Sequence, residues 1–75
     1  MLVKTNNRII NLDKVSEIVK DDSNLMLYFY FIDENRTSVK FEDESMLDNA
    51  FNGITSGYFY GHLICDITEY LVIVN

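Results

Sequence analysis

The sequence predicts an α+β domain: an antiparallel β-meander of about four strands packed by one amphipathic helix, then a short C-terminal helix or strand. Three observations lead to this prediction. An apolar and aromatic run from Leu25 to Ile32 is followed, across a polar break, by the alternating segment 37–42, which indicates two strands and a turn. Apolar residues then recur at helical spacing between residues 46 and 54. Turn-like breaks near 6–7, 12–14, 21–24 and 33–36 are short, and short connections favour antiparallel neighbours.

The turn of this central hairpin decides which side chains share a face, because side chains alternate along a strand. A loop of two or four residues would pair Tyr30 with Val39. A three-residue loop, 34–36, would pair Phe31 with Val39 instead, with Asn35 or Arg36 in the left-handed conformation of a bulged turn. We favour the three-residue loop because it gathers one fully apolar face, made of Leu27, Phe29, Phe31, Val39 and Phe41.

The other face of the hairpin is a candidate interaction surface, composed of Met26, Tyr28, Tyr30 and Ile32. It would lie beside Ser38, Lys40 and Glu42, and such a half-polar face tolerates partial exposure because tyrosine keeps its hydroxyl in water while its ring is buried. Aromatic residues and methionine are also enriched at protein contact surfaces. The alternative is that the C-terminal segment of the same chain covers this face, as is usual for strands that are apolar on both sides.

The N-terminal third predicts two further turns and a strand. Asn6 and Asn7 separate two short apolar runs, which suggests a tight hairpin in which Val3 faces Ile10. The segment 16–20 then indicates another strand, ended by the polar cluster 21–24.

The helix is predicted from a cap and an apolar face. Asp43 or Ser45 can cap its N-terminus, and Ser56-Gly57 should end it. Its apolar face consists of Met46, Leu47, Ala50, Phe51 and Ile54.

The C-terminal part allows two interpretations. A short helix that starts after Asp66 would align Ile67, Tyr70, Leu71 and Val74. The run 70–74 is apolar and partly β-branched, so it fits a final strand equally well. We favour the short helix.

Composition bounds the class of protein. Seventy-five residues make a single domain, and no apolar run approaches the ~20 residues that span a bilayer. The single cysteine, Cys65, excludes an intramolecular disulfide and fits a reducing compartment, so we expect a cytoplasmic protein. The net charge is −6 and the six basic residues are scattered, which argues against direct binding to nucleic acid or to anionic membranes.

One group of residues carries potential chemistry: His62, Cys65, Asp66 and Glu69. On a continuous helix they would share a face, and all four residue types bind metals. Their spacing matches no established zinc signature, and Asp66 serves better as a cap. Cys65 and His62 would also need an electropositive setting to act as nucleophile and base, whereas this neighbourhood is acidic and apolar. We therefore predict no metal, no cofactor and no catalytic activity.

A second group is acidic: Glu42, Asp43, Glu44 and Asp48. Such a group is ordinarily a solvated helix face. The alternative is a surface that competes for the basic site of a nucleic-acid-binding protein through charge complementarity.

The segment Arg8-Ile-Ile-Asn-Leu-Asp-Lys-Val-Ser-Glu-Ile18 is followed by an aromatic strand, a Val39-Lys-Phe-Glu strand and an acidic-capped helix, and this order resembles many short uncharacterised bacterial and phage proteins. In these proteins an Ile-Asn-Leu-Asp-x-Val entry leads into a β-meander closed by a helix. The resemblance covers about residues 8 to 55 and implies a fold, but it transfers no catalytic residue.

Three functions follow, in order of preference. The first is a non-catalytic protein-interaction module that self-associates as a homodimer or other homo-oligomer, through the Met26/Tyr28/Tyr30 face or the C-terminal segment. The second is an acidic inhibitor or regulator of a protein with a basic surface. The third is a small metal protein or enzyme that uses His62 and Cys65.

Overall fold

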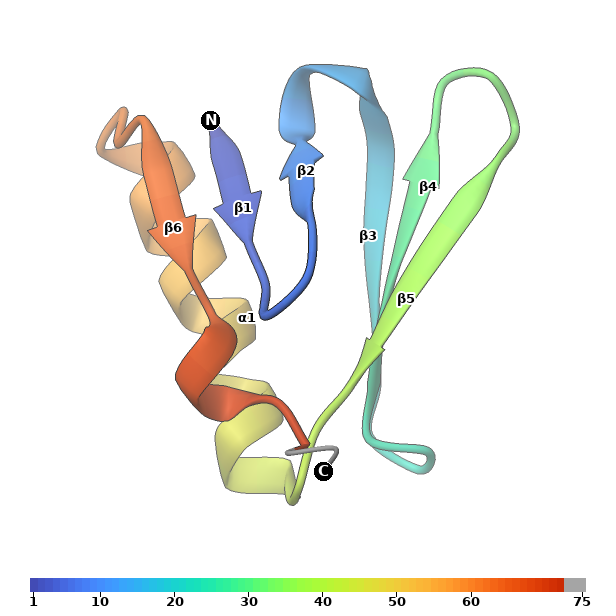
Figure 1. The fold of residues 1–75 in the computed structure, drawn as a ribbon, viewed down its shortest axis with the longest axis vertical. Coiled ribbons are helices and arrows are strands. Elements are labelled where there is room, and N and C mark those ends of the chain that lie inside the picture. The colour runs from blue at the N-terminus through green and yellow to red at the C-terminus, as the bar shows by residue number, and fades with distance from the viewer. Residues whose placement is uncertain (73–75) are drawn as a thin grey trace.

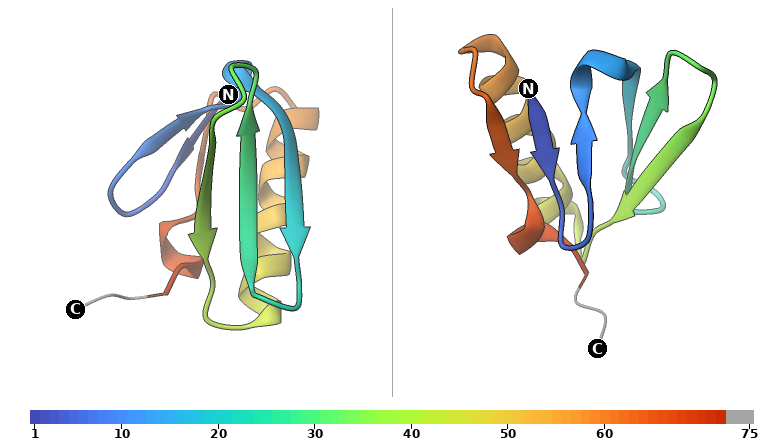
Figure 2. Two further views of the ribbon diagram at one scale, coloured as in Figure 1. Left: turned by 90° about the vertical axis from the view of Figure 1, so that its right-hand side faces the viewer. Right: turned by 45° about the horizontal axis from the view of Figure 1, so that its top comes forward.

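The computed structural model describes residues 1–72, which form an α+β domain with two small sheets (Figure 1). The elements in chain order are β1 (Leu2–Lys4), β2 (Ile9–Asn11), the 3-10 helix η1 (Leu12–Lys14), β3 (Val15–Asp21), β4 (Met26–Phe31), β5 (Arg36–Lys40), α1 (Glu44–Phe59), β6 (Ile64–Asp66) and the 3-10 helix η2 (Thr68–Tyr70). Sheet A has the strand order β2-β1-β6, and sheet B has the order β3-β4-β5. Helix α1 packs against β6 and η2 on one side and β4 on the other. Figure 2 shows α1 running along β3.

The expected four-stranded meander is wrong: the antiparallel meander in sheet B has three strands. After β2 the chain turns through η1, so β3 pairs with β4 and not with β2. Strand β6 arrives from the far end of the chain and pairs in parallel with β1, which closes the second sheet. Parallel pairing of distant strands leaves no local pattern in the sequence.

The first hairpin confirms its prediction. Val3 lies opposite Ile10, and the Thr5 N–H donates to the Arg8 carbonyl at 2.9 Å, which leaves Asn6 and Asn7 as the two-residue turn. The Arg8 N–H also donates to the Thr5 hydroxyl at 3.2 Å, so the buried Thr5 has polar partners.

The second hairpin keeps the predicted apolar face but not the predicted register. Val39 lies opposite Leu27 instead of Phe31, a shift of four residues, and an even shift leaves the same side chains on the same face. The turn lies earlier in the sequence than the predicted loop 34–36, because the Phe31 N–H donates to the Asn35 carbonyl at 2.8 Å. The left-handed residue is accordingly Glu34, with φ 74°, and neither Asn35 nor Arg36.

One hydrophobic core lies between the two sheets and α1. Sheet A contributes Val3 and Ile10, and the C-terminal segment contributes Ile67 and Leu71. The buried residues from sheet B and from α1 are Leu27, Phe29, Val39, Phe41, Leu47, Ala50 and Ile54. At the edge of the core, Lys20 of β3 links sheet B to α1: its ammonium donates to the Asp48 carboxylate at 2.8 Å. This hydrogen bond raises the pKa of Lys20.

The C-terminal segment contains features of both predicted alternatives. A short 3-10 helix, Thr68–Tyr70, follows Asp66, whose carboxylate accepts the Thr68 N–H at 2.9 Å. Leu71 then forms an isolated antiparallel bridge with Phe41. Val74 and the end of the predicted strand lie outside the described residues.

Helix α1 begins as predicted and ends later. Asp43 caps its N-terminus by accepting the Met46 N–H at 2.9 Å. Gly57, expected to stop the helix, is buried inside it, and the chain instead leaves the helix at Gly61, with φ 73°. The His62 N–H donates to the Gly57 carbonyl and the Gly61 N–H to the Tyr58 carbonyl, at 2.8 and 3.2 Å, which is the Schellman pattern of helix termination.

The two exposed glycines of this region should respond oppositely to alanine. Gly53→Ala places a Cβ 3.9 Å from the Cys65 sulfur, an ordinary contact, and should raise the free energy of unfolding by about 0.5–1 kcal/mol because the helix interior favours alanine. Gly61→Ala should lower it by about 1–2 kcal/mol because the left-handed conformation is strained for alanine. Urea denaturation measures both, and equal effects of the two substitutions would contradict this assignment of the helix end.

The described residues contain no helix of the length and apolar character that membrane crossing requires.

Candidate interaction surface

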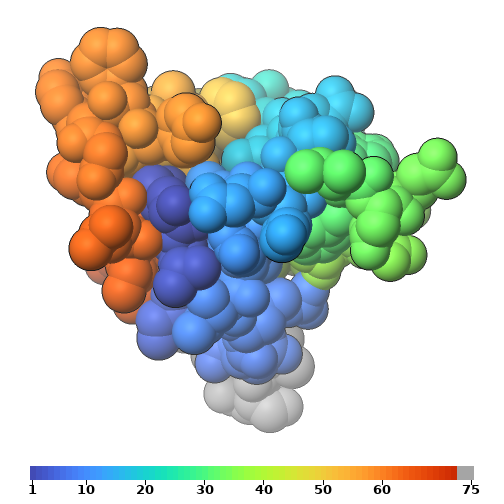
Figure 3. Space-filling view, turned by 90° about the horizontal axis from the view of Figure 1, so that it is seen from above, coloured from blue at the N-terminus to red at the C-terminus, as the bar shows by residue number. Residues whose placement is uncertain are grey.

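The most exposed apolar surface of the described chain lies where α1 ends and β6 begins. Five side chains there expose between 60% and 82% of their area, and we call them the 58–64 corner: Tyr58, Phe59, Tyr60, Leu63 and Ile64. In the space-filling view of Figure 3 the orange part of the chain, which contains this segment, forms one projecting corner of the molecule. Apolar side chains exposed together in this way are typical of contact surfaces.

The corner is held by the termination of α1. The left-handed Gly61 and the two Schellman hydrogen bonds fix the turn that separates the last helical residues from β6. Gly57 is buried close to the Met1 side chain, whereas Phe59 at the end of α1 and Tyr60 after it are exposed; Tyr58 lines the edge of the groove between β3 and α1. The rings of Phe59 and Tyr60 meet edge to face with centroids 5.2 Å apart, which orders the aromatic part of the surface.

The corner is also uncharged. No aspartate, glutamate, lysine or arginine occurs in residues 49–65, the longest such stretch of a chain whose net charge is −6.

Taking ~150–250 Å² for a whole aromatic side chain, the exposed part of the five residues amounts to on the order of 600 Å². An area of this size lies at the upper end of what single-chain proteins leave exposed.

The predicted interaction surface on the central hairpin is less exposed. Met26, Tyr28 and Tyr30 lie half-buried on the outer face of sheet B, whereas Ile32 is exposed in the β4–β5 loop. The guanidinium of Arg36 lies over the Tyr28 ring, 5.4 Å from its centroid. Within residues 1–72 the C-terminal segment forms β6 and η2 and then pairs with Phe41 and the Lys40 carbonyl at the end of β5. A dimer contact through the Tyr28 face stays a prediction.

Two members of the predicted acidic surface have structural roles. Asp43 caps α1, and Asp48 binds the ammonium of Lys20. Glu42 and Glu44 are exposed. The four residues therefore lie together at the start of α1, but only part of their charge is free to attract a partner.

The residues with potential metal chemistry do not share a helix face, contrary to the geometry considered from the sequence. His62 precedes β6, Cys65 and Asp66 lie on opposite faces of that strand, and Glu69 belongs to η2. Asp66 instead forms an ion pair with Lys4 at 3.8 Å. Residues 1–72 contain no cluster of three or more His, Cys, Asp or Glu side chains that is arranged to hold a metal ion.

Cys65 is poorly suited to nucleophilic chemistry. Burial, and secondly the negative charge of Asp66, raise the pKa of its thiol above the ordinary value. The reactive thiolate is therefore a minor species at neutral pH. Its sulfur lies 3.9 Å from the position that a Cβ on Gly53 would take, which places the thiol against α1.

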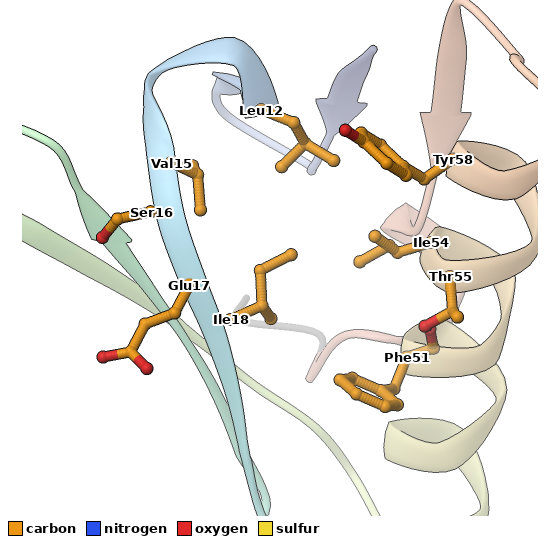
Figure 4. A pocket seen from close by; sticks show the side chains of 9 residues that line it. All are labelled: Leu12, Val15, Ser16, Glu17, Ile18, Phe51, Ile54, Thr55 and Tyr58. Atoms are coloured by element: carbon orange, nitrogen blue, oxygen red, sulfur yellow. The ribbon is translucent and has the colours of Figure 1, made fainter.

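A groove of about 360 Å³ separates β3 from α1 (Figure 4). Ile18 points from the strand into the gap, Phe51 and Tyr58 point into it from the helix, and Ser16 and Glu17 point away. The Thr55 hydroxyl donates to the Phe51 carbonyl of its own helix at 2.9 Å. The groove is therefore mainly apolar, and no nucleophile lies in contact with a base in it, so it does not have the arrangement of a catalytic site.

Neither the family models nor the curated proteins nor the solved structures with which we compared the chain match it. The candidate surface therefore rests on this chain alone. Sequence reasoning named the C-terminal segment as an alternative dimer surface but did not single out the five residues of the 58–64 corner, because apolar residues near the end of a helix resemble core residues. The available signal was the absence of charge from residues 49–65 together with three consecutive aromatic residues.

Proposed function

We propose that this protein is a non-catalytic interaction module that self-associates as a homodimer through the 58–64 corner. The observation that carries the proposal is the exposure of five large apolar side chains within the segment 58–64. In a twofold dimer the same patch is used on both copies. Burial of ~600 Å² from each copy gives a total of about 1,200 Å², the lower end of specific protein interfaces.

Charge favours a second copy as the partner. Two molecules that each carry −6 repel one another, and the repulsion is smallest where neither contributes a charged side chain. The corner meets this condition because residues 49–65 are uncharged. A partner with a basic surface would instead be drawn to the start of α1, where Glu42 and Glu44 are exposed. We place the hypothesis of an acidic regulator second, because it uses the start of α1 and leaves the exposed apolar residues of the corner without a role.

Sedimentation equilibrium of the wild-type chain and of the double variant Phe59→Ser/Leu63→Ser tests the proposal. Each substitution removes about 1.5–3 kcal/mol of apolar burial, and a twofold interface contains both positions twice. We therefore expect the dissociation constant to rise at least ~100-fold, since each 1.4 kcal/mol changes it tenfold.

The matched controls are Ile9→Ser and Ile32→Ser, which remove apolar side chains exposed to similar extents, 65% and 68%, outside the corner. Both should leave the dimer intact. Tyr28→Ser/Tyr30→Ser tests the alternative face on sheet B and should also leave it intact. A wild-type chain that sediments as an 8.8 kDa monomer at millimolar concentration would refute self-association.

A further inference from the structure

Strand β6 is an unprotected sheet edge next to the 58–64 corner. It is the outer strand of sheet A, and only its β1 side is paired. Exposed edges pair readily with another chain unless they carry bulges, charges or a covering segment. The only charged residue of β6, Asp66, is already bound to Lys4.

The other strand edges carry such protection. Strand β3 has a bulge between Val15 and Glu17. Strand β5 carries Arg36 and Lys40, and the Val72 N–H occupies the Lys40 carbonyl at 3.1 Å. Strand β2 runs directly into η1. Among the described strands, β6 is therefore the edge best suited to pairing.

The hydrogen bonds to β1 show which backbone groups of β6 are free. The Leu63 carbonyl accepts from Leu2 at 2.8 Å, and the Ile67 N–H donates to Lys4 at 2.9 Å. Because successive residues of a strand direct their backbone groups to opposite sides, residues 63, 65 and 67 face β1. The N–H and C=O groups of Ile64 and Asp66 consequently point to the open edge.

We infer that the partner recognised at this edge is the β6 strand of a second copy, paired antiparallel about a twofold axis at Ile64; this inference rests on the proposed self-association. Ile64 of each copy donates its N–H to the Ile64 carbonyl of the other. The two sheets A then form one continuous six-stranded sheet.

The side chains suit this axis. Leu2 lies beside Ile64 in the register of sheet A, so Leu2 and Ile64 of both copies form one apolar row across the axis. With the axis at Ile64, the two Asp66 carboxylates are separated by four residue positions along the paired strands, so they do not face one another. Each carboxylate also has Lys4 of its own chain as a partner. An axis centred on Asp66 would place like charges directly opposite one another, which is destabilising.

Amide hydrogen exchange measured by NMR tests the pairing. The Ile64 amide should exchange at least ~10-fold more slowly at concentrations where the dimer predominates than after dilution to the monomer. The Leu2 amide, which is bonded within the chain to Leu63, is the internal control and should be protected in both states. In Phe59→Ser/Leu63→Ser, the Ile64 amide should exchange rapidly at every concentration.

Ile64→Pro provides a second measurement. It removes the edge-facing N–H and replaces the Ile64 side chain with a smaller apolar one, but it breaks no hydrogen bond to β1, so the Leu2 amide should stay protected while the dissociation constant rises at least ~10-fold. Ile64→Val keeps the donor and should dimerise within a few-fold of wild type. A sedimenting dimer whose Ile64 amide exchanges as fast as in the double variant would overturn the strand pairing and leave the corner interface standing. A monomer at all concentrations would overturn both.

Discussion

Replacement of Phe29 by alanine should lower the free energy of unfolding by about 3–5 kcal/mol. Phe29 is fully buried at the centre of β4, the middle strand of sheet B, between Ile18 of β3 and Thr37 of β5. Its ring faces the core between the sheets and α1, and the surrounding strands cannot move in to fill the space it leaves. Both the lost burial and the remaining cavity therefore add to the cost.

A loss of this size is a large part of the total stability of a domain of 75 residues, which is about 4–11 kcal/mol. Urea denaturation followed by circular dichroism measures the change. Tyr28→Ala is the control: Tyr28 is adjacent in β4 but half-buried on the outer face, so its cost should be about 1 kcal/mol. Equal costs at positions 28 and 29 would show that the inward face of β4 is misassigned.

Local chemistry accounts for the parts of the fold that could be predicted. The Asn6-Asn7 turn, the cap at Asp43 and the apolar stripe of α1 each involve residues within a few positions of one another, so the sequence contains all of the relevant information. The same is true of the shared apolar face of the central hairpin, since side-chain alternation needs only the correct parity of the register.

The errors have non-local or conformational causes. The register of the hairpin depends on Glu34 adopting a left-handed conformation that asparagine would adopt more readily. The helix continues past Gly57, which is buried near Met1, a residue more than fifty positions away in the sequence. The division into two sheets depends on the parallel pairing of β1 with β6, which no local pattern specifies.

The candidate surface was also difficult to predict from the sequence, because it depends on which residues the rest of the chain covers. Tyr58, Phe59 and Leu63 are residue types typical of a core, and only the structure shows that they are exposed at the end of α1 and before β6 within residues 1–72. The acidic residues at 42–44 and 48 were visible in the sequence, but their capping and ion-pair roles became evident only from their partners.

Ile67→Ala should lower the free energy of unfolding by about 2–5 kcal/mol, and it tests whether the two sheets form one cooperative unit. Ile67 is fully buried where β6 leads into η2, and its N–H donates to the Lys4 carbonyl. It therefore joins sheet A to the core that contains Phe29 and Leu47. We expect amides of sheets A and B to lose protection at the same, lower urea concentration.

Ile9→Ala is the matched control for this variant, because it makes the same chemical change at an exposed position of sheet A and should alter stability by less than about 0.5 kcal/mol. If Ile67→Ala released the amides of sheet A while those of sheet B kept their wild-type midpoint, the two sheets would unfold separately. In that case β6 could change its pairing without unfolding sheet B, and dimer formation at its edge would be coupled to a local transition. A single shared midpoint instead means that β6 unfolds together with the whole core, so that the edge is already formed when a second copy binds.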